Sequence, residues 1–293
     1  MLASALLALC GFAKAQSTTV ATPRLDTITV EAARHRDAVE RQVRAFVTQI
    51  AVKPYDSSLA RWQTVAPICP LVAGLPRADG EYILARVSKI AAAAGAPLAP
   101  KHCKPNLYIV VSADPDALLK AWTKRDVWTF GDESDQGGAK IRKFLNSSSP
   151  IRAWYNAELY SEEGTPLGNT AECGSVMSCR ANLRATATRI TFNATRDLTS
   201  ALIMVDGPRS HGVNFGQLAS YIAMLGLAEI RDDADVGNAP SILHLFSRSM
   251  KDRPAGLSAW DEAFLKALYH TEQTDKQQLA EIKTAMIDGL VPR

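Results

Sequence analysis

The order of predicted elements indicates an α+β domain, a small sheet with helices packed on it. Helical patterns occupy both ends of the chain. Between them, residues 151–160 and 181–194 carry β-branched and aromatic side chains in partial alternation, and residues 200–205 form a short apolar run. Runs of strands between runs of helices are typical of α+β folds. We find no linker or repeat that divides residues 31–293, and therefore interpret them as a single domain.

The composition supports a sizeable core, since 47% of the residues are hydrophobic and 22% are charged. A first helix is predicted up to Pro54, and a second over residues 79–94, before the stop signals Gly95 and Pro97. Residues 62–76 contain three prolines and are predicted to be irregular. The apolar positions at helical spacing in the first helix are Val39, Val43, Phe46, Val47 and Ile50.

Residues 107–111 (LYIVV) are nearly all apolar and predict a strand covered on both faces. Asp114 is the expected cap of a third helix that has Pro115 at its first position. A surface loop over 131–138 and a short helix around 140–145 complete this part. The predicted apolar stripe of the third helix is Ala117, Leu118, Ala121 and Trp122.

Three more helices are expected after residue 214. The first spans 214–225 and ends at Gly226; Asn214 and Gln217 are spaced for a capping box. Ser258 with Asp261, and Thr274 with Gln277, open the other two. The predicted stripes are Leu218, Tyr221, Ile222 and Leu225; then Phe264, Leu265 and Leu268; then Leu279, Ile282 and Met286.

The N-terminus predicts export. Residues 2–12 are an apolar run, far shorter than the about 20 residues that cross a bilayer. Ala13-Lys14-Ala15 is a cleavage pattern, so residues 1–15 are predicted to be a signal peptide, although no positive residue precedes the apolar run. The alternative is a lipoprotein acylated at Cys10. Residues 16–30 form an expected flexible lead-in, no transmembrane segment follows, and the predicted location is periplasmic or secreted.

Cysteine usage agrees with export. The mature chain retains Cys69, Cys103, Cys173 and Cys179, and an even number in an exported chain suggests disulfides. Three pairings are possible, and the local spacing favours Cys69 with Cys103 and Cys173 with Cys179. Zinc is the competing use of four cysteines, but the chain lacks a Cys-x-x-Cys pair.

The charge pattern argues against a nucleic-acid partner. The formal net charge is only +3, and the basic residues are spread along the chain instead of clustering. Sequence motifs of serine hydrolases, P-loop proteins, dinucleotide-binding proteins and HExxH metallopeptidases are absent. The sequence therefore predicts no cofactor and no metal.

Isolated polar residues have ordinary structural interpretations. The five histidines (His35, His102, His211, His244 and His270) show no metal-ligand spacing. Residues 232–237 alternate carboxylates as calcium loops do, but Gly237 and His244 occupy ligand positions, so a solvated connection fits better. Residues 132–135 form a second acidic cluster with the same interpretation.

Four segments resemble a group of uncharacterised secreted proteobacterial proteins: 205–206 (VD), 217–227 (QLASYIAMLGL), 240–243 (PSIL) and 261–269 (DEAFLKALY). The likeness extends over most of the mature chain. It implies localisation and a single fold, without an activity. The same block is similar to zincin metallopeptidases in layout. Alignment on Gly226 puts Ala219 and Ala223 at the two histidine positions and Ser220 at the glutamate, so the resemblance implies a zincin-like fold that has lost its ligands.

Two functions follow as hypotheses. The first is a non-catalytic, pseudo-peptidase-like scaffold that binds a peptide or protein. Its tryptophans could line a groove, although core packing is the better expectation for them. The second is a hydrolase with an unrecognised site, using His211 and an aspartate such as Asp206. The five tryptophans are Trp62, Trp122, Trp128, Trp154 and Trp260.

Overall fold

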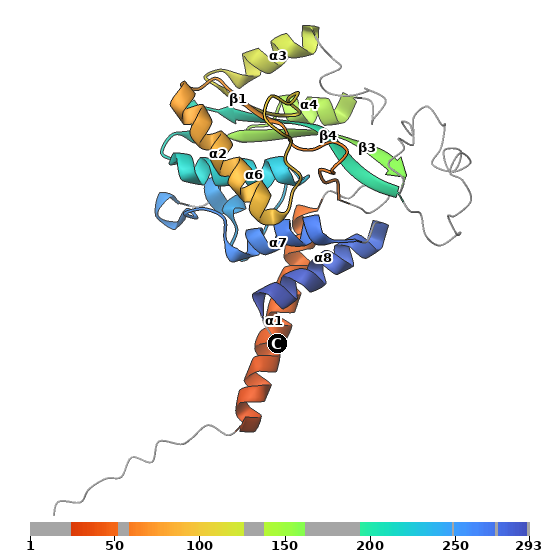
Figure 1. Ribbon diagram of the computed structural model, residues 1–293. Helices are drawn as coiled ribbons and strands as arrows, with labels where there is room; N and C mark the ends of the chain where they lie inside the picture. Colours follow the sequence, from red (N-terminus) through yellow and green to blue (C-terminus); the bar gives the residue numbers. More distant parts are fainter. Residues whose placement is uncertain are drawn as a thin grey trace, which may run out of the picture.

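A four-stranded mixed sheet lies at the centre of the computed structural model, which describes residues 25–51, 59–125, 138–161, 194–247, 249–272 and 275–291 (Figure 1). The strand order is β1-β2-β4-β3. Strands β1, β2 and β4 are parallel, and β3 is antiparallel to β4. The predicted α+β class is confirmed. The strands are β1 (Pro70–Ala73), β2 (Leu107–Ser112), β3 (Ile151–Ser161) and β4 (Ala194–Asp206).

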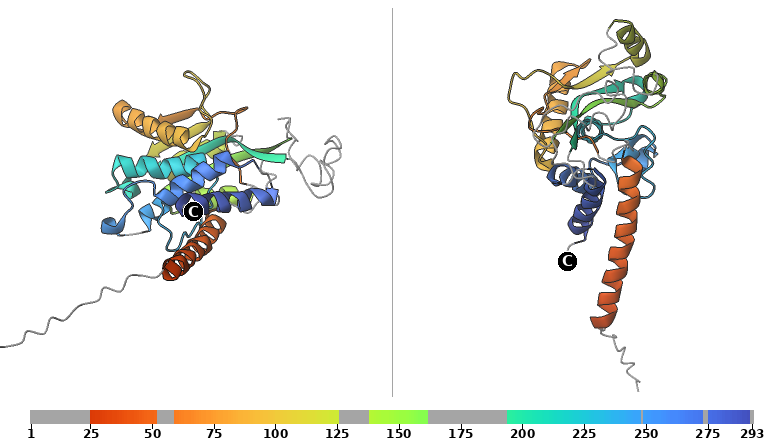
Figure 2. Two further views of the ribbon diagram at one scale, coloured as in Figure 1. Left: turned by 60° about the horizontal axis from the view of Figure 1, so that its bottom comes forward. Right: turned by 90° about the vertical axis from the view of Figure 1, so that its right-hand side faces the viewer.

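Helices cover both faces of the sheet (Figure 2). On one face lie α2 (Arg77–Ala94) and α6 (Phe215–Leu227), backed by α7 (Ala259–His270) and α8 (Asp275–Leu290). On the other face lie α3 (Pro115–Arg125) and α4 (Ala139–Leu145). The long α1 (Leu25–Ile50) packs against α8 through its C-terminal half and projects away from the sheet. Short 3-10 helices cover Pro208–Ser210, Ile242–Phe246 and Met250–Asp252.

The two faces bury cores of different size. Leu107 and Ile109 of β2 face the large core beneath α2 and α6. The alternate residues Tyr108 and Val110 pack on the small core beneath α3 and α4, so this strand is covered on both faces as predicted. The small core consists of Leu119, Phe144, Trp154, Leu202 and Met204.

Several boundaries differ from the sequence prediction. The segment predicted to be irregular contains β1, because a parallel strand of four residues can begin at Pro70 with its ladder partner in β2. The lead-in expected over 16–30 becomes helical at Leu25. The strand predicted over 200–205 is the second half of the longer β4.

The predicted apolar stripe of α3 is partly wrong. Leu119, which is absent from the predicted stripe, is fully buried in the small core, and Leu118 and Trp122 pack around it. Ala117 and Ala121 are exposed. A helix of eleven residues presents too narrow an apolar face for the alanines to be included.

Both capping boxes that fall within the described chain are confirmed. Asn214 accepts a hydrogen bond from the Gln217 backbone at 2.9 Å while the Gln217 side chain accepts one from the Asn214 backbone. Ser258 and Asp261 form the same arrangement at α7. Asp114 also accepts from Ala117 N at 2.9 Å, as expected for a cap. Thr274, Pro54 and residues 181–193 lie outside the described residues.

A disulfide joins Cys69 to Cys103, as predicted, with their Cα atoms 6.0 Å apart. Cys69 directly precedes β1, and Cys103 lies in the loop before β2, so the bond ties these neighbouring strands together. Cys173 and Cys179 lie outside the described residues. Within the part of the chain that is described, we find no helix long and apolar enough to span a bilayer.

Candidate functional site

The zincin-like positions of α6 lie in the large core. Ala219, Ser220 and Ala223 are fully buried, and the Ser220 hydroxyl donates to Gly216 O at 2.7 Å. As predicted, α6 packs on β4. Gln217 and Tyr221, which lie one turn apart on α6, also have structural roles. Gln217 belongs to the capping box, and Tyr221 packs edge-to-face on Phe246 with ring centroids 5.2 Å apart.

Asp206 and His211, the pair in the hydrolase hypothesis, lie beyond the carboxyl end of β4. The Asp206 carboxylate accepts a hydrogen bond from Arg209 N at 2.9 Å and lies 3.4 Å from Arg209 Nε. His211 is exposed at the end of the following 3-10 helix. Among the described residues no hydrogen bond joins His211 to Asp206, and the contacts of the carboxylate stabilise the turn.

The four tryptophans of the described chain pack in or against the interior, as the core-packing interpretation expects. Trp62, Trp154 and Trp260 are buried, and Trp62 Nε1 donates to Gly226 O at 2.8 Å. Trp122 is half-buried against the small core. Trp128 lies outside the described residues. These side chains therefore do not line a groove.

The acidic segment 232–237 is engaged locally. Asp232 lies 3.5 Å from Lys143 Nζ, and Asp235 Oδ1 accepts from Gly237 N at 2.9 Å. The Arg231 guanidinium, hydrogen-bonded to Asp233, lowers the pKa of that carboxyl. No group of three or more metal-ligating side chains occurs among the residues that the structure describes. The second cluster, 132–135, falls outside them.

Histidines His244 and His270 have structural partners. Buried His244 contacts Ala239 O through Nε2 at 3.1 Å, and His270 Nδ1 lies 2.8 Å from Lys266 O. Both contacts hold the ring against the local backbone. The sequence interpretation of these two histidines as structural is consistent with this geometry.

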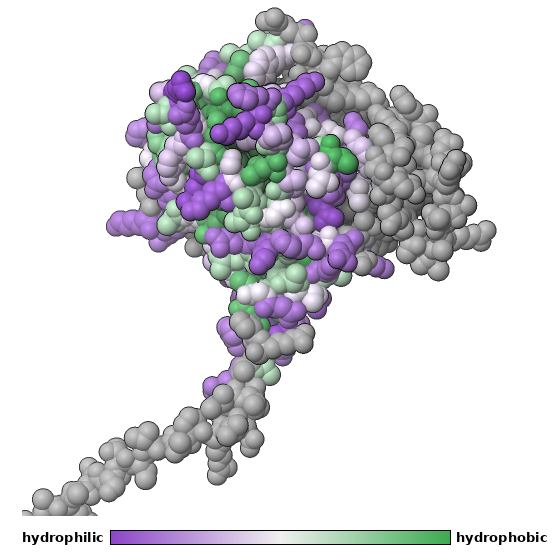
Figure 3. Space-filling view, in the orientation of Figure 1, coloured by the Kyte–Doolittle hydropathy of each residue, from purple (hydrophilic) through white to green (hydrophobic). Residues whose placement is uncertain are grey.

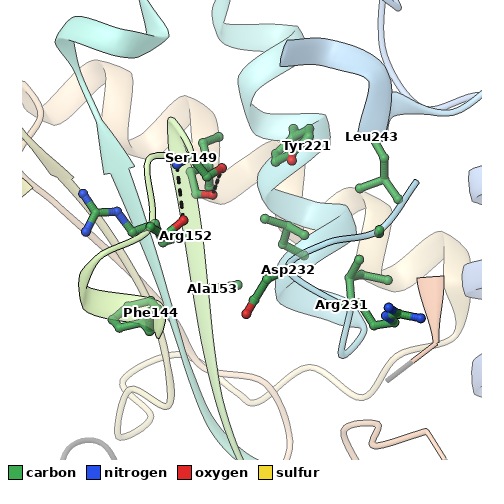
Figure 4. Close-up of a pocket in the computed structure, with 13 residues that line it drawn as sticks. Phe144, Ser149, Arg152, Ala153, Tyr221, Arg231, Asp232 and Leu243 are labelled. Atoms are coloured by element: carbon green, nitrogen blue, oxygen red, sulfur yellow. Dashed lines mark hydrogen bonds between the residues drawn. The ribbon is translucent and has the colours of Figure 1, made fainter. Parts of the chain in front are cut away.

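A small cleft of about 60 Å³ opens beside β3, between this strand, α6 and the segment 230–234 (Figure 4). We call it the β3 cleft. In the close-up, Ala153 of β3 and Asp232 lie on opposite sides of it. The lining residues are Phe144, Ser147, Ser149, Ile151, Arg152, Ala153, Tyr221, Leu225, Ile230, Arg231, Asp232, Ala234 and Leu243.

The polar side chains of the β3 cleft are held by the fold. Arg152 donates to Leu145 O at 3.0 Å and pairs with Asp116. Ser149 donates to Ile151 O at 2.7 Å. Burial raises the pKa of Tyr221 to about 12, so its phenol stays protonated at neutral pH. None of these groups is arranged as a nucleophile with a general base.

The backbone of β3 has unpaired groups on its outer side, including those of the cleft-lining residue Ala153. Pro150 O accepts from Asp206 N at 2.8 Å, which fixes the alternation along the strand. Arg152 and Trp154 therefore turn their N–H and C=O groups toward β4, while Ala153 and Tyr155 turn theirs outward. Within the described chain, the backbone groups of Ala153 and Tyr155 have no hydrogen-bond partner.

Glu229, which pairs with Arg196, and two further buried carboxylates were not singled out from the sequence as interior groups. Asp261, fully buried, accepts hydrogen bonds from Ser241 Oγ at 2.5 Å and Ile242 N at 2.8 Å besides its capping role. Asp197 of β4 is 2% exposed, and its Oδ1 has no partner in the described residues. Burial raises the pKa of the Asp261 and Asp197 carboxyls. The spacing of Ser258 and Asp261 in the sequence indicated the capping role of Asp261 but not its burial.

The backbone of Arg61 forms an isolated parallel β-bridge with Asp197 of β4. Its guanidinium donates to Leu268 O and Thr271 O, each at 2.7 Å, at the end of α7. The charge of Arg61 opposes the effect of burial on the Asp197 pKa. These contacts connect the loop before β1 to β4 and α7, so the role of Arg61 is structural.

Comparisons with protein-family models, with curated proteins and with solved structures give no match.

Proposed function

We propose that this is an exported, non-catalytic domain that binds an extended segment of a peptide or protein along the outer edge of β3. The observation that carries the proposal is the edge itself. Ala153, which lines the β3 cleft, and Tyr155 have unpaired backbone groups on the outer side of this eleven-residue strand. An extended segment could pair with such an edge through backbone hydrogen bonds, while side-chain pockets select its sequence.

Export is supported by two features. The chain begins with an apolar run and the Ala13-Lys14-Ala15 junction. The Cys69–Cys103 disulfide is of the kind that persists in oxidising compartments. Together they favour a periplasmic or secreted location.

A binding role is favoured over catalysis by the state of the polar side chains. Those of the β3 cleft form hydrogen bonds or ion pairs that shape the fold. The α6 positions that correspond to zincin ligands are alanines in the core. Asp206, the aspartate of the hydrolase alternative, is engaged by Arg209.

The test begins with peptides of about nine residues, enough for one strand, selected from a random displayed library on the mature, disulfide-bonded protein. Their affinities are then measured by fluorescence anisotropy for the wild type and for Ala153→Pro. Proline removes the outward N–H of residue 153 and leaves the ladder to β4 intact. Losing one or two backbone hydrogen bonds should weaken binding by about tenfold.

The matched control is Ala153→Gly, which keeps the N–H. It should bind the selected peptides within about threefold of wild type, since it leaves the backbone donor in place. Equal affinity of wild type and Ala153→Pro would contradict binding along this edge. Turnover of peptide, ester or glycan substrates, abolished by His211→Ala or Asp206→Asn, would instead support the hydrolase alternative.

A further inference from the structure

Two exposed aromatic residues lie together on the helical face of the molecule, away from the β3 cleft. Tyr82 on α2 and Phe215, the first residue of α6, are 48% and 42% exposed. Their rings meet edge-to-face with centroids 6.5 Å apart. Single exposed apolar residues are common on protein surfaces, but a pair contributed by two helices forms a defined platform.

Two arginines flank this aromatic pair. Arg86 lies one helical turn after Tyr82 on α2. Arg253 donates to Gly212 O at 3.1 Å, just before the start of α6. The segment that contains Arg253 is fixed to α6, because Gln217 donates to Pro254 O at 2.8 Å. The four residues Tyr82, Arg86, Phe215 and Arg253 are called the aromatic–arginine patch.

The arginines of this patch form no ion pair with a carboxylate, whereas four other half-buried or buried arginines of the described chain do. Arg36 and Arg196 pair with Asp288 and Glu229, while Arg152 and Arg231 pair with Asp116 and Asp233. No ion pair involves Arg86 or Arg253 in the chain as described.

In addition, the Nε atoms of Arg86 and Arg253 are buried and find no acceptor among the described residues. A buried donor without an acceptor destabilises a folded protein, so such groups require an explanation. Acidic side chains of adjoining sequence already have partners: Glu81 pairs with Arg77, and Asp252 accepts from Ser249. Neither of these carboxylates forms an ion pair with Arg86 or Arg253 in the described chain.

We propose that the aromatic–arginine patch is a second binding site, which docks an acidic segment of a partner protein. Carboxylates of the segment would pair with the two guanidinium groups, and an apolar side chain beside them would pack on Tyr82 and Phe215. A protein partner fits better than a membrane. Figure 3 shows hydrophilic and hydrophobic residues interspersed on this face, whereas a membrane-binding face needs a continuous apolar area.

The probe is a fluorescein-labelled peptide that alternates glutamate with leucine and phenylalanine, and its counterpart has glutamine for every glutamate. Anisotropy is measured at about 50 mM and about 500 mM sodium chloride, since salt screens exposed charges. The acidic peptide should bind the wild type about tenfold more tightly than the glutamine peptide at low salt, and this preference should shrink at high salt.

Variants assign the effect to the patch. Arg86→Gln alone, and Arg86→Gln with Arg253→Gln, should reduce the preference for the acidic peptide, the double variant abolishing it. Phe215→Ser should weaken both peptides. Arg77→Gln, which removes an exposed arginine of the same helix, should leave binding unchanged. Melting temperatures identify variants that fail to fold. If the double variant does not fold, Arg86→Gln and the salt dependence of wild-type binding test the proposal.

Three results would overturn the proposal: equal binding of the two peptides, wild-type preference in the folded Arg86→Gln variant, or tighter binding to vesicles of anionic lipid that the same substitutions abolish. Ala153→Pro should still bind the acidic peptide. The two proposals can therefore be told apart. If Ala153→Pro loses only the library-selected peptides, the β3 edge is responsible. If the patch variants lose only the preference for glutamate, the aromatic–arginine patch is responsible.

Discussion

The two edge strands of the sheet differ in length and in whether other segments cover their outer backbone groups. β1 has four residues, begins with a proline and is tied to the loop before β2 by the disulfide. Just before it, Ile68 pairs with the segment around Leu98, so the start of this edge is covered. β3 has eleven residues, and Ala153 and Tyr155 are unpaired in the described chain.

Proteins normally protect an exposed edge with short strands, prolines or covering segments, because open edges pair with other chains. The β1 edge has this protection. The β3 edge is long and borders a cleft instead. This contrast is why the proposed recognition is assigned to the β3 edge and not to the β1 edge.

The largest expected effect concerns the protected edge. Replacing both Cys69 and Cys103 by serine removes a bond that closes a loop with a sequence separation of 34 residues. In the chain-entropy account this lowers the free energy of unfolding by about 4 kcal/mol. Urea unfolding of the double variant measures the change. A loss smaller than about 1 kcal/mol would show that β1 is held without the disulfide.

A smaller loss of stability is expected where β3 is anchored. Arg152 is buried in contact with Leu145 O and Asp116, and Asp116 is largely exposed. Arg152→Met keeps the bulk of the side chain but leaves the Leu145 carbonyl unpaired, which should cost about 1–3 kcal/mol. Asp116→Asn serves as the control and should cost less, because its side chain remains solvated. Equal losses would place the stabilisation in the ion pair.

The buried Asp197, opposite Glu158 of β3, predicts a pH dependence. Burial raises its pKa in the folded state above the value in the unfolded chain, so folding favours the protonated carboxyl. This stabilisation is complete below the unfolded pKa and is lost as pH rises through the folded pKa. The stability of the wild type relative to Asp197→Asn should therefore be greater near pH 3 than at pH 7. Denaturant unfolding at both pH values measures it. The opposite trend would indicate that the hydrogen bonds of Thr195 and Gln63, together with the charge of Arg61, outweigh burial.

The smallest stability effect is expected for Ala153→Pro. Because the N–H of residue 153 faces away from β4, proline removes no bond of the ladder. The free energy of unfolding should change by less than about 1 kcal/mol. Trp154→Pro, which removes a hydrogen bond to β4 and also the buried indole, should lose about 3 kcal/mol or more. Similar losses for the two variants would mean that the alternation along β3 is wrong.

Local sequence signals predicted much of this fold. Asn214 with Gln217, Ser258 with Asp261, and Gly95 after α2 act through neighbours within a few residues, and the structure confirms them. The Cys69–Cys103 pair was likewise accessible from spacing. Helix α6 next to β4 followed from their short connection.

The candidate site depends on long-range pairing, which sequence periodicity does not encode. Nothing in residues 151–161 indicates that β3 forms an edge, since its place follows from β4 pairing with β2 on its other side. Arg86 and Arg253 are far apart in sequence. They come to the same surface because the segments that carry them both pack beside α6. β1 was missed because its first residue is Pro70 and Pro67 lies just before it.

Amide hydrogen exchange along β3 tests the central claim most directly. In the free protein, the outward amides of Ala153 and Tyr155 should exchange faster than the inward amides of Arg152 and Trp154. Saturation with a library-selected peptide should slow the two outward amides by at least about tenfold and leave the inward ones unchanged. Outward amides that are already protected in the free protein, or that exchange at the same rate with the peptide bound, would contradict recognition at this edge.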